Sequence, residues 1–137
     1  MKTTTITNSK LFQSIITVCI LSAFGISQNT LSVEVGDGTI DVLYNSDADI
    51  GGFQFSVSGV NITDASGGAA ADNGFTVNTS SSIVLGFSFS GTVIPAGDNL
   101  LTVLTFEPLE NEACLIEVVI SSANAVTLDT EVGSCVE

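Results

Sequence analysis

The strongest constraint on the fold is a series of short stretches, rich in β-branched and aromatic residues, that clusters of glycine, asparagine, aspartate and serine separate. This pattern is typical of all-β proteins, and no stretch carries a sustained helical period. The sequence therefore predicts an all-β fold, an antiparallel β-sandwich of about nine strands. The expected strands are 31–35, 38–44, 50–58, 60–63, 74–78, 82–90, 99–107, 115–120 and 125–132.

One of these stretches, IGGFQFSVSG at 50–59, has an echo in VLGFSFSG at 84–91. Side chains alternate between the two faces of a strand. The first stretch therefore puts Phe53, Phe55 and Val57 on one face and serines and a glutamine on the other. The same rule predicts that Leu85, Phe87 and Phe89 point together into the core, opposite Ser88 and Ser90. An alternative is that the phenylalanines form an exposed platform for sugars, but such platforms usually use Trp or Tyr. The chain has no Trp and one Tyr, Tyr44.

The first residues have the pattern of an export signal. Lys2 and Lys10 precede an apolar run at 11–24, which small residues follow. We expect a secretory signal peptide at 1–27 and a single domain at 28–137. The run is shorter than the roughly 20 residues of a membrane span, although an uncleaved N-terminal anchor stays open as an alternative. The protein is accordingly predicted to be secreted.

The charge balance excludes several partners. Both basic residues lie in the predicted signal peptide, so the mature domain carries 15 acidic side chains and no basic one. Phosphate backbones require Lys or Arg, and nucleic acid is therefore excluded, as are anionic membrane surfaces. The same field favours divalent cations and cationic surfaces.

Two cysteines remain once Cys19, inside the apolar run of the signal, is set aside. In an exported chain, Cys114 and Cys135 are expected to form a disulfide. On the chain-entropy model such a bond stabilises the fold by about 3 kcal/mol.

Catalytic side chains are scarce. The sequence has no His and no Arg, and its two Lys lie in the predicted signal peptide. Acid–base chemistry would depend on carboxylate pairs such as Glu110 with Glu112 or Asp47 with Asp49, as in glycosidases. These pairs lie in expected turns, where solvated acids are common, and the chain is predicted not to be an enzyme.

Calcium is the cofactor hypothesis. Asn45, Asp47 and Asp49 alternate in one expected loop, and Asp72 and Asn73 lie in another. Hard oxygen ligands from loops suit Ca²⁺. Turn formation is the competing explanation of the same residues.

Two longer segments resemble the cohesin domain and its relatives among the carbohydrate-binding β-sandwiches. They are DIGGFQFSVSGVNITDASG at 49–67 and NGFTVNTSSSIVLGFSFSGTVIPAGDNLLTVLTFEP at 73–108. The second contains Ile94-Pro-Ala-Gly-Asp98 followed by an apolar strand, as in cohesin sequences. The resemblance implies a jelly-roll-like sandwich, exported and non-catalytic, that docks dockerin-bearing proteins or binds polysaccharide.

Three functions follow from these observations. The first is a cohesin-type module that docks a protein partner in an extracellular, polysaccharide-related assembly. The second is a carbohydrate-binding module. The third is a self-assembling structural or adhesive protein. Because the phenylalanines are assigned to the core, the binding face is predicted on the opposite side. Its expected residues are Gln54, Ser56, Ser58, Ser88 and Ser90.

Overall fold

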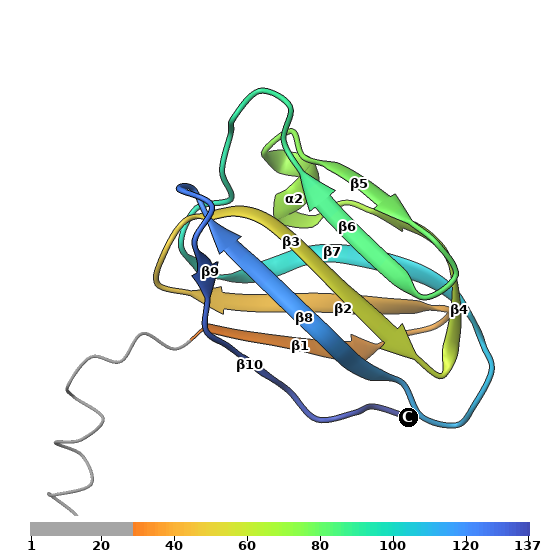
Figure 1. Ribbon diagram of the computed structural model, residues 1–137. Helices are drawn as coiled ribbons and strands as arrows, with labels where there is room; N and C mark the ends of the chain where they lie inside the picture. The colour runs from red at the N-terminus through yellow and green to blue at the C-terminus, as the bar shows by residue number, and fades with distance from the viewer. Residues whose placement is uncertain (1–28) are drawn as a thin grey trace, which may run out of the picture.

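The structure is a computed structural model that describes residues 29–137. The predicted signal peptide lies outside the described residues. Two five-stranded sheets pack face to face (Figure 1). Sheet A has the order β10-β1-β2-β7-β4, and sheet B has the order β5-β6-β3-β8-β9.

The strands of sheet A are β1 (Asn29–Val35), β2 (Thr39–Ser46), β4 (Val60–Ser66), β7 (Gly97–Pro108) and β10 (Thr130–Val132). Those of sheet B are β3 (Ile50–Ser58), β5 (Thr76–Thr79), β6 (Ile83–Phe87), β8 (Cys114–Ser122) and β9 (Thr127–Leu128). The prediction of an all-β sandwich is confirmed. Within residues 29–137, no helix has the length and hydropathy needed to cross a lipid bilayer.

The last expected strand, 125–132, divides between the two sheets. β9 pairs with β8 in sheet B, whereas β10 pairs with β1 in sheet A. The β1–β10 pairing is parallel, with Asn29 opposite Thr130. The chain thus crosses from one sheet to the other between Leu128 and Thr130, and the strand count rises from nine to ten.

A one-turn helix, α2 (Gly68–Asp72), interrupts the segment expected as a long turn. Ala69 and Ala70 are buried in the core. A Cβ at Gly68 would overlap the backbone of Leu101 on β7. The helix therefore fits because small residues let its backbone approach β7 closely, and it is too short to give a periodic signal.

The core lies between the sheets, and β3 fills much of it as predicted. Phe53, Phe55 and Val57 are at most 3% exposed. The ring of Phe53 stacks on those of Phe55 and Phe75, with centroids 6.0 and 6.2 Å apart. Hence these phenylalanines are structural and are not a sugar platform.

The prediction for the echo segment is wrong. Val84 and Gly86 face the core, whereas Leu85 is 39% exposed and Phe87 is only partly buried. Phe53 lies opposite Gly86 across the β3–β6 ladder, and its ring occupies the space that a side chain at Gly86 would need. The strand ends at Phe87, so Phe89 falls in the following loop and is 84% exposed. A shift of one residue along a strand moves every side chain to the other face. The contact between Phe53 and Gly86 therefore turns Leu85 and Phe87 outward, opposite to the expectation.

Candidate protein-docking face

The outer face of sheet B is the side that points away from sheet A. Residues opposite each other in a ladder point the same way. Gln54 on β3 lies opposite Leu85 on β6 and Val119 on β8. Ser56 lies between Ile83 and Ile116 in the same way. β3 therefore presents a narrow polar line that apolar side chains flank on both sides.

We call these flanking residues the apolar band. Four of its members are 39–45% exposed, and the fifth, Phe87, is partly buried. Large exposed apolar patches on a soluble protein mark interaction sites. The apolar band consists of Ile83, Leu85, Phe87, Ile116 and Val119.

A shallow depression of about 210 Å³ lies within this face. Gly52 lies opposite Phe87 and leaves room between β6 and β8 because it has no side chain. Leu85, Phe87 and Val119 of the apolar band contribute to its lining. The depression has the size and lining to receive an apolar side chain.

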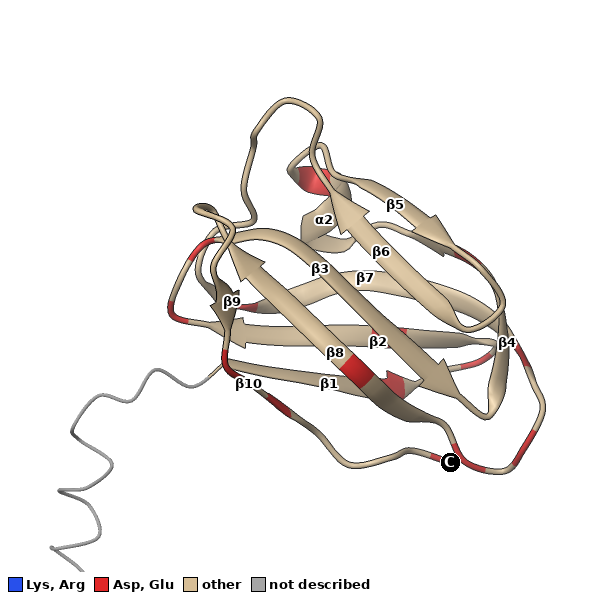
Figure 2. Cartoon of the chain, viewed as in Figure 1, with Lys and Arg blue, Asp and Glu red and all other residues tan. Residues whose placement is uncertain are grey.

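Glu117 is the only acidic residue on the strands of sheet B, where Figure 2 shows a single acidic segment, on β8. The β3–β8 register shifts between Gln54 and Ser56, and Glu117 adopts a positive φ of 53° there. The hydroxyl of Ser56 donates a hydrogen bond to Glu117 Oε1 at 3.3 Å. This bulge presents one carboxylate beside an otherwise uncharged face.

The loop between β6 and β7 holds the exposed aromatic residue Phe89. The ring of Phe89 meets that of Phe87 edge to face, with centroids 4.9 Å apart. Ser88 Oγ accepts hydrogen bonds from the backbone N–H groups of Ser90 and Thr92. Thr92 Oγ1 in turn donates to the carbonyl of Asn73 at 2.7 Å. These bonds tie the base of the loop to the segment after α2, with Phe89 projecting beside the apolar band.

The five residues predicted as a binding face do not form one surface. Gln54, Ser56 and Ser58 are on the outer side of β3, but Ser56 is only 7% exposed. Ser88 and Ser90 lie beyond the end of β6, where their hydroxyls serve the loop. Sequence reasoning missed the apolar band, because it placed the apolar residues of β6 in the core.

The predicted calcium ligands surround the turn between β2 and β3. Asn45 lies opposite Asp98 at the end of β2. Asp49 Oδ1 accepts a hydrogen bond from the N–H of Ala96 at 3.0 Å, and the N–H of Asp47 donates to Asn29 Oδ1. Asp49 thus joins this turn to the loop that precedes β7. Calcium binding at Asn45, Asp47 and Asp49 stays a prediction.

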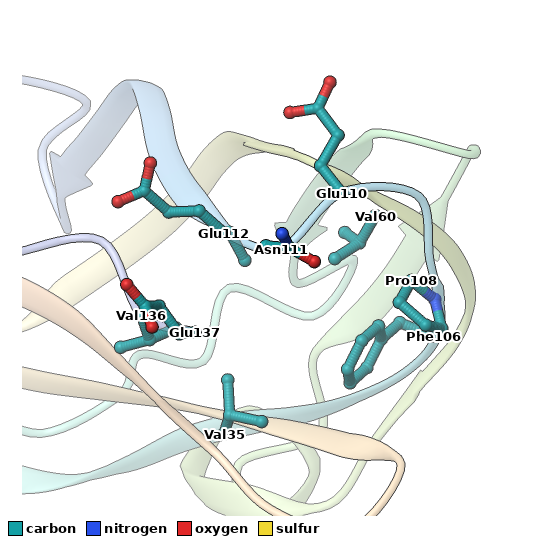
Figure 3. Close-up of a pocket in the computed structure, with 10 residues that line it drawn as sticks. Val35, Val60, Phe106, Pro108, Glu110, Asn111, Glu112, Val136 and Glu137 are labelled. Carbon is teal, nitrogen blue, oxygen red and sulfur yellow. The ribbon is translucent and has the colours of Figure 1, made fainter.

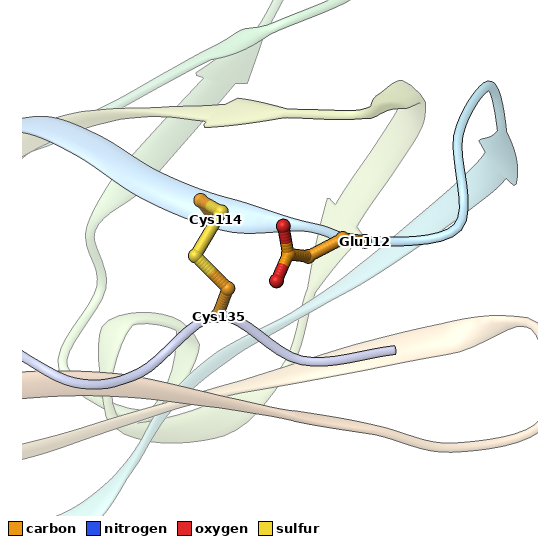
Figure 4. A group of neighbouring side chains, drawn as sticks. All are labelled: Glu112, Cys114 and Cys135. Carbon is orange, nitrogen blue, oxygen red and sulfur yellow. A yellow bond between two sulfur atoms is a disulfide. The ribbon is translucent and has the colours of Figure 1, made fainter.

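Cys114 and Cys135 form the predicted disulfide, with an S–S distance of 2.07 Å (Figure 4). Two backbone hydrogen bonds between Ala113 and Val136 flank it. Together with Glu112 these cysteines make the one grouping of three potential metal ligands found in residues 29–137. Both sulfur atoms are engaged in the disulfide, so the grouping holds the C-terminal segment and has no free thiolates.

Tyr44 lies on the core side of β2 and is 4% exposed. Its hydroxyl donates a hydrogen bond to the carbonyl of Pro95 at 3.0 Å. Burial raises the pKa of the Tyr44 phenol, and the nearby carboxylate of Asp98 raises this pKa further. The only tyrosine of the chain is therefore a structural residue and is not a ring for sugar stacking.

Comparison with solved structures relates this fold to cohesins. A non-cellulosomal cohesin from the archaeon Archaeoglobus fulgidus superposes with a TM-score of 0.57 at 15% identity, over 77% of this chain and 86% of that one. A type II cohesin from the cellulosome of Acetivibrio cellulolyticus gives 0.56 at 8% identity, over 79% and 93%. The cohesin of a type I cohesin–dockerin complex from Clostridium thermocellum gives 0.55 at 15% identity, over 79% and 89%.

These similarities establish a cohesin-like β-sandwich, as the sequence resemblance implied. At such low identity they establish the fold alone. No protein-family model matches the chain, and no curated protein matches it in sequence.

Proposed function

We propose that this protein is a non-catalytic binding module that docks a protein partner, of the dockerin kind, through the outer face of sheet B. The observation that carries the proposal is the apolar band on a face that has one acidic residue, in a chain with 15 acidic residues. The centres of protein interfaces are depleted of charge and enriched in apolar and aromatic side chains.

The fold supports the choice of partner. Among the solved structures that share it is a cohesin in complex with a dockerin. The disulfide supports a location outside the cytoplasm, where such bonds persist. In the proposed complex, the depression at Gly52 receives an apolar side chain of the partner, and Phe87 and Phe89 border the contact.

The test compares two aspartate variants, one in each sheet. Val119 on β8 is 45% exposed and Val132 on β10 is 43% exposed, so Val119→Asp and Val132→Asp introduce the same charge at side chains of similar exposure, and circular dichroism checks that both variants are folded. Wild-type protein and both variants serve as bait for dockerin-bearing proteins from the same source, and affinity is measured with the protein recovered.

We expect Val119→Asp to weaken binding at least about thirtyfold, the loss typical of an interface hot spot, and Val132→Asp to leave the affinity unchanged. Equal affinities of the three proteins would contradict docking through sheet B. Two other results would replace the proposal by its alternatives: retention of the wild type on an insoluble polysaccharide without any protein partner, or a wild-type dimer that Val119→Asp dissociates.

A further inference from the structure

Glu117 differs from the other acidic residues of the described chain because it lies on a strand of sheet B (Figure 2). The hydroxyl of Ser56 donates a hydrogen bond to Glu117 Oε1 at 3.3 Å. Ser56 points outward, since its neighbours Phe55 and Val57 are buried in the core and side chains alternate along a strand. The carboxylate of Glu117 therefore lies on the outer face, among the residues of the apolar band.

A bulge in β8 holds this carboxylate in place. Two residues of β8, Glu117 and Val118, occupy the space opposite Phe55 alone. Val118 packs against the core, and Glu117 is exposed, with a positive φ of 53°. Bulges of this kind redirect a side chain at a binding site. The backbone and the hydroxyl of Ser56 together orient the charge before any partner arrives.

The described part of the chain has no basic side chain to neutralise this charge. Residues 29–137 contain no Lys, Arg or His. The neighbours on the face are apolar, because Ser56 lies between Ile83 and Ile116, which are 41% and 43% exposed. A partner that covers the face removes water from Glu117, and an unpaired charge without water is unfavourable. A cationic side chain of the partner offsets this cost, and its alkyl stem lies along the isoleucines.

The carboxylate is separate from the depression at Gly52. Gly52 and Ser56 are four residues apart on β3, which is about 13 Å along a strand. The depression is lined by Leu85, Phe87 and Val119 and suits an apolar side chain. The face thus has two different contact points, one apolar and one negative, at a fixed distance from each other.

We propose that Glu117 is a specificity-determining residue of the docking face, which selects a partner protein with a lysine or arginine about 13 Å from an apolar anchor. This inference rests on the proposed function, because it names the chemistry of the partner at the same face. A partner with the apolar anchor alone leaves Glu117 buried and unpaired, so the carboxylate rejects it. Charges at interfaces act in this way on the choice of partner more than on affinity.

The probe is a displayed library of a small helical scaffold, randomised at its exposed positions and selected at low ionic strength on the wild-type protein. The library is also selected on Glu117→Gln, which removes the charge but keeps the length and an oxygen that can accept from Ser56. Asp64→Asn is the matched control, because Asp64 is exposed on β4 in sheet A, also at a shift of register. Val119→Asp identifies the clones that bind sheet B.

We expect the clones from the wild type to share a lysine or arginine among apolar residues, and the clones from Glu117→Gln to lack it. Wild-type clones are expected to bind Glu117→Gln about tenfold more weakly, between the effects of an exposed ion pair and of a buried charge pair. Their affinity for Asp64→Asn stays that of the wild type. Selection on Glu117→Lys is expected to favour aspartate or glutamate at the shared position.

Two results would overturn the inference, and they differ in what they leave standing. If the clones share no basic residue, or bind the wild type and Glu117→Gln equally, the carboxylate has no part in recognition, while docking through sheet B remains supported. If no clone is enriched, or the enriched clones bind Val119→Asp as tightly as the wild type, sheet B is not a docking face, and the proposed function fails together with the inference.

Discussion

The outer faces of the two sheets differ sharply in charge, although one chain forms both. The strands of sheet A carry six acidic residues, and those of sheet B carry one. On sheet A two of the acids even face each other, because Glu34 lies opposite Asp41. The outer face of sheet B carries the apolar band instead.

The two outer faces are unfavourable in different ways: sheet A carries like charges, and sheet B exposes apolar side chains. Like charges opposite each other destabilise a sheet, and exposed apolar patches favour association. Because most of the acidic residues on strands lie in sheet A, a partner can bury the outer face of sheet B while dehydrating little charge. The comparison thus supports sheet B as the docking face and sheet A as the solvated one, and the following variants test its physical basis.

The largest expected effect concerns the C-terminal segment that runs from sheet B to sheet A. The disulfide fixes its end to the start of β8. Cys135→Ser is expected to lower the free energy of unfolding by about 3 kcal/mol, because the unfolded chain regains loop freedom. Chemical denaturation measures the change, with Ser134→Ala as the control. A loss below about 1 kcal/mol would show that hydrogen bonds alone hold the segment.

The next effect tests which side of β6 faces the core. A Cβ at Gly86 would overlap the Phe53 ring, whereas one at Gly52 would meet the Gly86 carbonyl oxygen at an ordinary 3.4 Å. Gly86→Ala is therefore expected to destabilise the fold by about 2 kcal/mol through overpacking. Gly52→Ala, on the outer face, should change stability by less than about 0.5 kcal/mol. If the two variants unfold at the same denaturant concentration, the assignment of inner and outer faces is wrong.

The smallest effect concerns the repulsion on sheet A. Glu34→Gln removes one of two like charges that lie opposite each other, and we expect it to stabilise the fold by about 0.5 kcal/mol at low salt. Glu131→Gln is the matched control, because Glu131 lies opposite the uncharged Thr30. The difference between the two variants should vanish near 1 M NaCl, where the Debye length falls to about 3 Å. A difference that persists there would mean that the pair does not act through charge.

The sequence predicts the inner face of β3 correctly, because Phe53, Phe55 and Val57 alternate with polar residues and so define a single apolar face. In β6, Ile83, Val84 and Leu85 are apolar in succession, so alternation cannot choose a face. The choice depends on the empty space at Gly86, which Phe53 fills from another strand. Such a contact between distant residues is absent from any local pattern.

The apolar band left a signal that could have been used. Unbroken apolar runs at 83–85 and 118–120 put apolar side chains on both faces of two strands in an antiparallel sheet. No further layer was predicted to cover the second face, so these runs indicate an exposed apolar surface. The pocket that Val35, Val60, Phe106 and Val136 line (Figure 3) gave no such signal, because these segments meet only in the folded chain.

Hydrogen–deuterium exchange of the protein with and without its bound partner tests the central claim most directly, since protection reports which strands the partner covers. The account predicts slower exchange in β3, β6 and β8 and in the loop that carries Phe89, with unchanged exchange in β1 and β2. Protection confined to sheet A, with the amides of β6 and β8 unaffected, would contradict it.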